Sequence, residues 1–147
     1  MAGQAIVMLG TQKTLASSGG SIANNAVAQA STASYDIAAD GAYYPDAEFV
    51  LTATFGTAPT EGTTLALYAR PLDVDGTADA QVPEASRPTV FIGSFVVDNV
   101  TSAQTMTLRA YDVPTKADYY LHNNGTGQTV SAGWVLKVTP RTVGPAA

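Results

Sequence analysis

The sequence contains no cysteine and a single histidine, His122. Without cysteine the chain cannot form disulfide bonds, thiolate nucleophiles or cysteine-ligated metal sites. His122 ends the run Tyr119-Tyr-Leu-His122, and no carboxylate or nucleophile beside it in sequence would make it a general base. Glutamate is also scarce: Glu48 opens a predicted strand, whereas Glu61 and Glu84 fall in turns. These scarcities predict a protein that is not an enzyme, with His122 as a solvent-facing or interface residue at the end of a strand.

Charged side chains make up only 13% of the chain, about half the usual share. The seven lysine and arginine residues are scattered singly and the net charge is −5. This pattern argues against binding to nucleic acid or to an anionic membrane surface. No apolar run approaches the ~18–20 residues of a membrane-spanning helix. A surface so poor in charge suggests that other protein covers much of it; the alternative is a small all-β domain with an exterior rich in threonine and serine.

The chain instead carries many short runs in which apolar and polar residues alternate. In residues 48–55 the side chains of Phe49, Leu51 and Phe55 share one face, with the period of a half-buried strand. Similar runs occupy residues 63–69, 89–97, 103–111, 117–122 and 129–139. With residues 35–37 and a short run from Gln4, they predict eight strands. We expect an all-β, eight-stranded, jelly-roll-like sandwich of two sheets.

Two connections between these runs have distinct characters. The segment Asn123-Asn-Gly-Thr-Gly127 predicts a tight hairpin, because Asn and Gly tolerate the positive φ that such turns need. Residues 70–88 form a proline-rich connection longer than the ~12–15 residues beyond which a structureless loop is usually functional or disordered.

The long connection holds the best metal-binding candidate in the sequence. Its oxygen-bearing side chains have the ligand spacing of a helix-flanked calcium loop, at Asp73, Asp75, Thr77, Asp79 and Glu84. However, Gly76 stands at position 4 of this loop rather than position 6, and no predicted helices flank it. We therefore favour a solvated acidic loop and predict neither a metal nor a cofactor.

Residues 1–45 differ in composition from the rest of the chain. After a short apolar run, residues 11–34 are rich in Ala, Ser, Gly, Thr and Asn and have too few large apolar side chains to fold alone. We predict an extended N-terminal arm over residues 1–34, followed by the sandwich domain over residues 35–147; a helix over residues 22–30 is the alternative. Partner contacts of the arm are assigned to Ile6, Val7, Leu9, Leu15 and Ile22.

The aromatic residues do not form an obvious carbohydrate-binding stripe. Trp134 alternates with Leu136, which favours a place in the core. The tyrosine pairs at 43–44 and 119–120 are adjacent, so each pair places one ring on either face of a strand.

From residue 44 to residue 140 the chain resembles the small jelly-roll virion proteins of tailed bacteriophages. The resemblance covers roughly two-thirds of the 147 residues and concerns the pattern of strands and turns. Its features follow in order: strand 48–55, turn Thr60-Glu-Gly62, strand 65–68, the long loop, Phe91-Ile-Gly-Ser-Phe95, strand 104–108, Asp112-Val-Pro114, the segment 119–125, and Ser131-Ala-Gly-Trp134.

The resemblance implies a structural role in the virus particle. Such proteins commonly serve as capsid decoration or cement proteins, and sometimes as tail, baseplate or head-spike parts; an N-terminal arm laid over neighbouring subunits is frequent among them. We expect a trimeric decoration protein that binds and stabilises the shell of major capsid protein from outside. It would lie on the capsid surface of the virion after synthesis in the host cytoplasm, since residues 1–9 lack the features of a signal peptide. A surface module that binds host glycans is the alternative from a different class.

Overall fold

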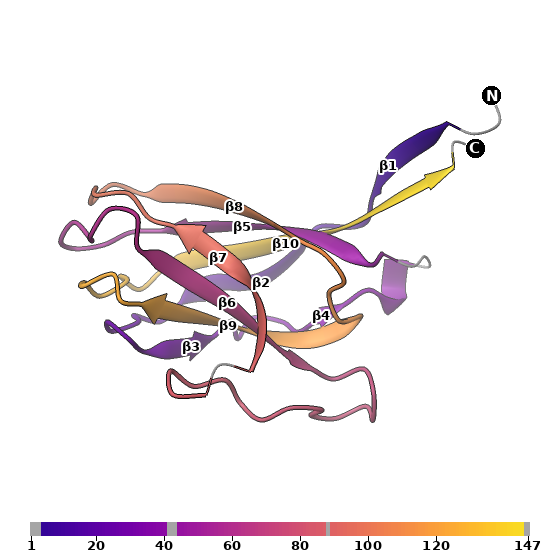
Figure 1. Ribbon diagram of the computed structural model, residues 1–147, viewed down its shortest axis with the longest axis horizontal. Helices are drawn as coiled ribbons and strands as arrows, with labels where there is room; N and C mark the ends of the chain where they lie inside the picture. The colour runs from indigo at the N-terminus through magenta and orange to yellow at the C-terminus, as the bar shows by residue number, and fades with distance from the viewer. Residues whose placement is uncertain (1–3, 41–43, 88, 146–147) are drawn as a thin grey trace.

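The computed structural model describes residues 4–40, 44–87 and 89–145. In these residues the protein has two antiparallel five-stranded sheets, one short 3₁₀ helix, η1 (Ala38–Asp40), and no α-helix. The sheets pack against each other as a sandwich (Figure 1), which confirms the all-β, two-sheet prediction. The strands are β1 (Ala5–Leu9), β2 (Lys13–Gly19), β3 (Val27–Gln29), β4 (Tyr35–Asp36), β5 (Asp46–Ala53), β6 (Thr64–Pro71), β7 (Val90–Val96), β8 (Gln104–Ala110), β9 (Lys116–Asn124) and β10 (Trp134–Pro145).

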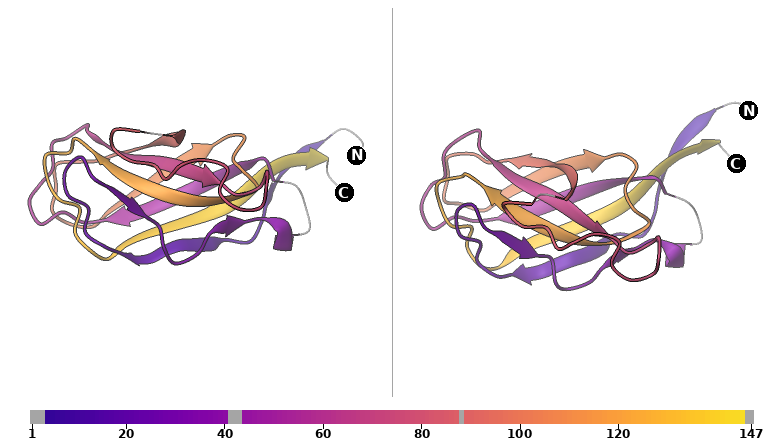
Figure 2. Two further views of the ribbon diagram at one scale, coloured as in Figure 1. Left: turned by 90° about the horizontal axis from the view of Figure 1, so that it is seen from below. Right: turned by 60° about the horizontal axis from the view of Figure 1, so that its bottom comes forward.

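Each sheet joins strands that are far apart in the sequence. The first sheet has the order β2–β10–β5–β8, and β1 pairs with β10 farther along the same edge as β2. The second sheet has the order β3–β9–β6–β7, and β4 pairs with β9 beside β3. The chain therefore crosses repeatedly between the two layers, which Figure 2 shows from two further directions.

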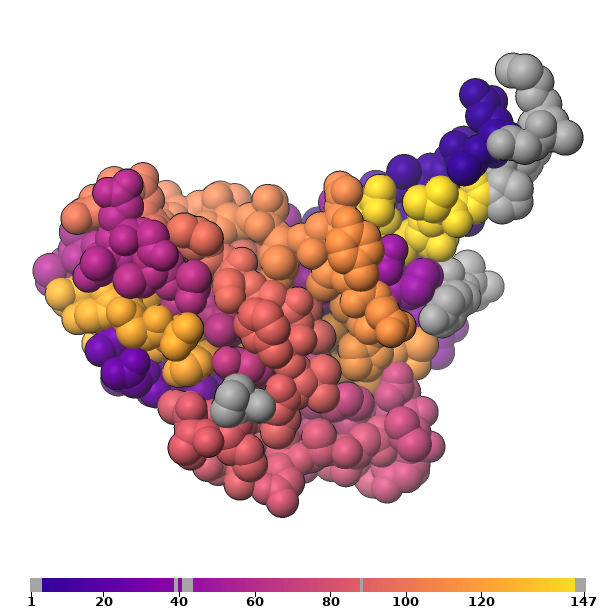
Figure 3. Space-filling view, viewed as in Figure 1, coloured from indigo at the N-terminus to yellow at the C-terminus, as the bar shows by residue number. Residues whose placement is uncertain are grey.

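The longest strand, β10, connects the sandwich to a projection. Its first part pairs with β2 on one side and with β5 on the other, and Arg141 is its last residue paired with β5, opposite Asp46. From Arg141 to Pro145 it pairs with β1. Beyond the end of β5, β1 and β10 thus continue as a two-stranded ribbon that stands out from the body (Figures 1 and 3).

The core lies between the two sheets. Buried and half-buried residues alternate along β5, and Phe49 and Leu51 are fully enclosed. Trp134 is buried as predicted, and its Nε1–H donates to the carbonyl oxygen of Gly20 at 2.7 Å. A buried indole N–H needs such a partner, so this bond fixes the tryptophan against the first sheet.

Most of the predicted N-terminal arm lies within the sandwich, which corrects the boundary expected at residue 34. β2 adds a strand to the first sheet and β3 adds one to the second. Leu15 and Ile22 are buried in the core, and Ile22 exchanges backbone hydrogen bonds with Val130 at 3.0 and 2.9 Å. The segment needs few large apolar side chains because strand pairing orders its backbone. Residues 22–30 form no helix.

The long connection after β6 lies over the outer face of the second sheet. Ala66, Tyr68 and Tyr120 form a small buried cluster on that face. The loop is held by the bond from Arg70 Nε to the carbonyl oxygen of Ala80, at 2.8 Å, and it buries Pro83. The hydrogen bond ties the loop to the end of β6.

Candidate binding surfaces

The projecting ribbon, defined as β1 together with residues 141–145 of β10, has an apolar face. Residues directly opposite in an antiparallel pair share a face, and the register places Val7 opposite Val143 and Leu9 opposite Arg141. Val7, Leu9 and Val143 are 53%, 60% and 55% exposed. Single exposed apolar residues are ordinary, whereas contiguous ones mark interaction sites. This face is therefore a candidate protein-binding surface.

The other face of the ribbon is largely apolar as well. It carries Ile6 and Met8, both partly exposed, together with Thr142 opposite Met8. Met8 lies over Gly144, because a Cβ atom on that glycine would stand 2.7 Å from the Met8 Cε atom. Methionine side chains adapt their shape to the surface they meet, so this face also suits contact with another protein.

The ribbon is almost free of charge. Its one charged side chain, Arg141, is directed to the body, where its Nε atom lies 3.6 Å from Oε1 of Glu48. The segment Gln4–Gly10 and residues 142–145 contain no charged residue. A partner would therefore meet apolar side chains and backbone groups here rather than an electrostatic pattern.

The ribbon brings together three of the five predicted contact residues: Ile6, Val7 and Leu9. The other two, Leu15 and Ile22, are core residues and are not available to a partner. Val143 was not among the predicted contact residues, because the last strand was predicted to end at residue 139. The signal that could have revealed this residue is the apolar run at residues 6–9, because such a run needs a second strand to pair with.

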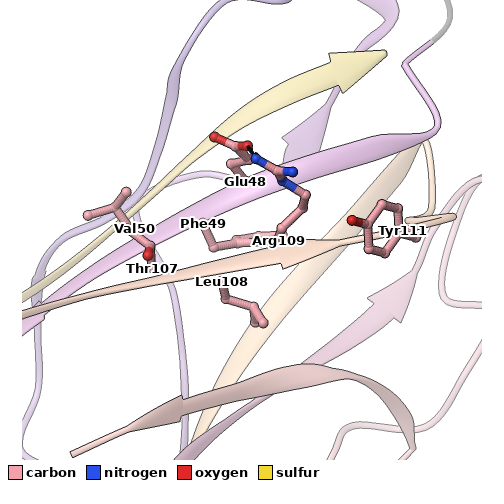
Figure 4. A pocket seen from close by; sticks show the side chains of 7 residues that line it. All are labelled: Glu48, Phe49, Val50, Thr107, Leu108, Arg109 and Tyr111. Carbon is pink, nitrogen blue, oxygen red and sulfur yellow. Dashed lines mark hydrogen bonds and ion pairs between the residues drawn. The ribbon is translucent and has the colours of Figure 1, made fainter. Parts of the chain in front are cut away.

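A hollow in the described surface lies where β5 and β8 run side by side. It has a volume of about 370 Å³ and is lined by Glu48, Phe49, Val50, Thr107, Leu108, Arg109 and Tyr111. In Figure 4 the Arg109 side chain lies beside Glu48; their Nη2 and Oε1 atoms are 2.6 Å apart. Hydrogen bonding to Glu48, and then to Tyr111, raises the pKa of Arg109 above its ordinary value. The Tyr111 side chain is 68% exposed.

The acidic loop uses its carboxylates as internal hydrogen-bond acceptors. Asp79 accepts bonds from the backbone N–H groups of Val74 and Asp75, at 2.8 and 3.0 Å. Asp73 accepts from the backbone N–H and the hydroxyl of Thr115; although burial opposes it, these bonds lower the pKa of Asp73. Glu84 pairs with Arg87 at 3.0 Å instead of completing the calcium spacing.

The single histidine lies on the face of β9 opposite Leu121, as the alternation predicted, but it is not solvent-facing. His122 is 7% exposed and is enclosed by its strand neighbours Val27 and Ala66 and by Tyr68, whose ring centroid is 6.0 Å away. Neither ring nitrogen has a hydrogen-bond partner among the described residues. Burial lowers the pKa of His122, which favours the neutral form of the ring.

Two further properties concern the described part of the chain. In it, no group of three or more histidine or acidic side chains is placed to hold a metal ion. None of its helices has the length and apolar character needed to span a membrane.

Comparison of the chain with protein-family models, curated protein sequences and solved structures found no match.

Proposed function

We propose that this protein is a structural component of a virus particle, a decoration protein that binds the shell of major capsid protein from outside. The observation that carries the proposal is the ribbon, which is uncharged beyond Arg141, largely apolar on both faces and held away from the body. Burial of apolar surface contributes about 25 cal/mol per Å². A shell repeats its binding surfaces by symmetry, so contacts that are weak singly are multiplied.

The order of the strands supports a jelly roll as the finer description of the fold. If β1 is left out and β3 and β4 are counted as one strand, eight strands remain, numbered along the chain from β2 as the first to β10 as the eighth. In the first sheet the neighbouring strands are then the first, eighth, third and sixth. In the second sheet they are the second, seventh, fourth and fifth. This interleaving is that of the eight-stranded jelly roll, an architecture of viral capsid proteins and of lectins.

The proposal is tested by mixing purified protein with capsids that lack it and measuring the bound fraction. The double variant Leu9→Ser/Val143→Ser should bind at least about tenfold more weakly, equivalent to ~1.4 kcal/mol, with an unchanged melting temperature because both side chains are exposed. Val96→Ser is the matched control, since Val96 is 62% exposed on β7. If the double variant binds capsids as strongly as the wild-type protein does, the ribbon is not the element that attaches the protein.

The position in the particle is tested by counting copies. A decoration protein occupies sites over the whole shell and should be present in hundreds of copies per particle. A dozen or fewer, by gel densitometry of purified particles, would instead support the tail, baseplate or head-spike role.

A second candidate function, glycan binding, is favoured by the hollow beside β8. Tyr111 offers an exposed aromatic ring next to the charged pair of Arg109 and Glu48, and sugar sites combine a few such polar groups with aromatic surface. This candidate predicts a signal on a glycan array that Tyr111→Ala removes and Leu9→Ser/Val143→Ser leaves intact. The decoration proposal predicts no such signal.

A further inference from the structure

The outer edge of β1 is a strand edge without a partner in the described residues. The N–H of Gly10 donates to the carbonyl oxygen of Pro140 at 2.8 Å, which continues the β1–β10 ladder by one hydrogen-bonded pair. Hydrogen-bonded and non-hydrogen-bonded pairs alternate along such a ladder. The backbone N–H and C=O groups of Ala5, Val7 and Leu9 therefore point away from β10.

This edge carries none of the usual protection against pairing. Natural edge strands are commonly guarded by lysine, proline or a bulge. The segment Gln4–Gly10 contains no charged residue and no proline, and its pairing with β10 runs in uninterrupted register from Ala5 to Leu9. A two-stranded ribbon alone is marginally stable in water, whereas three or more strands are stable. The edge thus has the properties of a strand that pairs further.

We propose that a second copy of this chain pairs with the edge, so that β1 lies antiparallel to β1 of the second copy across a two-fold axis at Val7. In this arrangement Val7 lies opposite Val7, and Ala5 lies opposite Leu9. Each copy contributes three outward N–H and three outward C=O groups, which form about six hydrogen bonds between the copies. The product is a four-stranded sheet in the order β10–β1–β1–β10, with the same surface used by both copies.

Geometry allows a second copy to be the occupant although the two bodies carry charge of the same sign. Two bodies of net charge −5 repel each other, but β1 itself is uncharged. Leu9 lies at the base of the ribbon, opposite Arg141, where the pairing of β10 with β5 ends, and Ala5 lies at the other end of β1. Antiparallel pairing therefore places the second body beyond the tip of the first ribbon, far from the first body.

The geometry also favours a two-fold pair over the trimer expected from the resemblance. A closed ring of ribbons would pair β1 of one copy with the free edge of β10 of the next. That edge offers the N–H of Val143, whereas Pro145 has none, and Arg141 is already paired with β5. The ring would hence form fewer hydrogen bonds than the two-fold pair.

The pairing does not depend on the proposed role in a virus particle. It uses the backbone edge of β1, whereas capsid attachment was assigned to the side chains of the ribbon faces. A dimer forms or fails to form in a solution of purified protein alone, so the two proposals fail separately. If both hold, pairing doubles the apolar area that faces the shell.

The test is the mass of the full chain in solution, by light scattering after size exclusion at several concentrations. Wild type should be a dimer that dissociates on dilution. Val7→Lys should be monomeric, because like charges directly opposite across paired strands are destabilising. Leu9→Lys is the matched control and should remain dimeric, since its charge faces Ala5 of the other copy. An equal mixture of Val7→Lys and Val7→Glu should recover the dimer.

A second measurement places the contact and covers the case of a poorly folded lysine variant. The chain has no cysteine, so Val7→Cys provides a single thiol, which a short bis-maleimide should link into covalent dimers. Val96→Cys, on β7, should give none. A monomeric or trimeric wild type, a dimer untouched by Val7→Lys, or equal cross-linking at both positions would each overturn the proposal.

Discussion

Trp134 lies directly on Gly19, so that a Cβ atom at position 19 would stand 1.9 Å from Cε2 of the indole. The two residues are cross-strand partners in the pairing of β10 with β2. Trp134 heads the fully buried side chains of the described core by volume. The absence of a side chain at Gly19 is therefore what allows the ring to lie against β2.

Replacing this glycine should destabilise the protein. Gly19→Ala forces the indole or β2 to move, and overpacking of this kind costs about 1–3 kcal/mol. Gly20→Ala is the matched control, because a Cβ atom there meets nothing within 4 Å; its effect should stay within about 0.5 kcal/mol. Urea denaturation of both variants measures the difference, and equal midpoints would show that the strand yields without cost.

The buried histidine should make stability depend on pH. Burial lowers the pKa of His122 in the folded state below its ordinary value of 6.5, so the unfolded chain binds the proton more readily. Its stabilising contribution is therefore complete above about pH 6.5 and is lost as pH falls through 6.5 towards the folded pKa. The urea midpoint should decrease between about pH 7.5 and 5.5, above the range in which ordinary carboxylates titrate.

The control for this effect is His122→Leu, which removes the titrating ring while keeping the site apolar. Its urea midpoint should change much less over the same pH interval. An equally steep decrease in the variant would assign the pH dependence to other groups.

The hairpin after β9 depends on one buried amide. Asn123 donates to the carbonyl oxygens of Ile22 and Gln128, at 3.1 and 2.7 Å, and accepts the hydroxyl of Thr126 at 2.6 Å. Asn123→Ala removes these three hydrogen bonds and should cost roughly 1.5–4 kcal/mol, at about 0.5–1.5 kcal/mol for each bond. Asn124→Ala, at an exposed neighbouring position, should be nearly neutral; similar losses in thermal stability for both would contradict the assignment.

The acidic loop should be indifferent to metal removal. Its carboxylates already accept hydrogen bonds from Val74, Asp75 and Thr115. Addition of EDTA should leave the melting temperature unchanged in differential scanning calorimetry. A fall of several degrees, reversed by calcium and absent in Asp75→Ala, would show that the loop binds a cation after all.

Truncation should separate the ribbon strand from the strands of the body. Deletion of residues 1–11 removes β1 and should leave the β-type circular dichroism and cooperative unfolding of the sandwich in place. Deletion of residues 1–33 also removes β2, β3 and the core residues Leu15 and Ile22, so that protein should not fold. A folded product of the longer deletion would mean that the other strands suffice for the core.

The sequence predicts the body strands because their side chains alternate cleanly, as along β5. It does not predict β2, whose buried residues Leu15 and Ala16 are adjacent. The pairing of β2 with β10 shifts register on either side of Leu136, and such an irregularity erases the period on which the prediction depends. β3 is only three residues long, too short for any period to appear.

For the ribbon, the sequence predicts the apolar contact residues and not their arrangement. The run Ile6–Leu9 is visible in the sequence, but its projection from the body results from β10 continuing past the end of β5. No local pattern expresses such a difference in strand length. The burial of His122 is hidden for a similar reason, since it depends on β3 and β6 as flanking strands.

The pairing of Ala5 with Pro145 has a practical consequence for anyone who handles this protein. An affinity tag or fluorescent protein fused before β1 or after β10 would emerge at the ribbon tip and could obstruct association there. The turn between β7 and β8 is a better insertion point, because it lies at the opposite end of β5 from the ribbon. The turn adjoins the pairing of Ala53 with Gln104, whereas the ribbon starts beside the pairing of Asp46 with Arg141. An epitope inserted into residues 99–102 would therefore report on the protein from the opposite end of the sandwich.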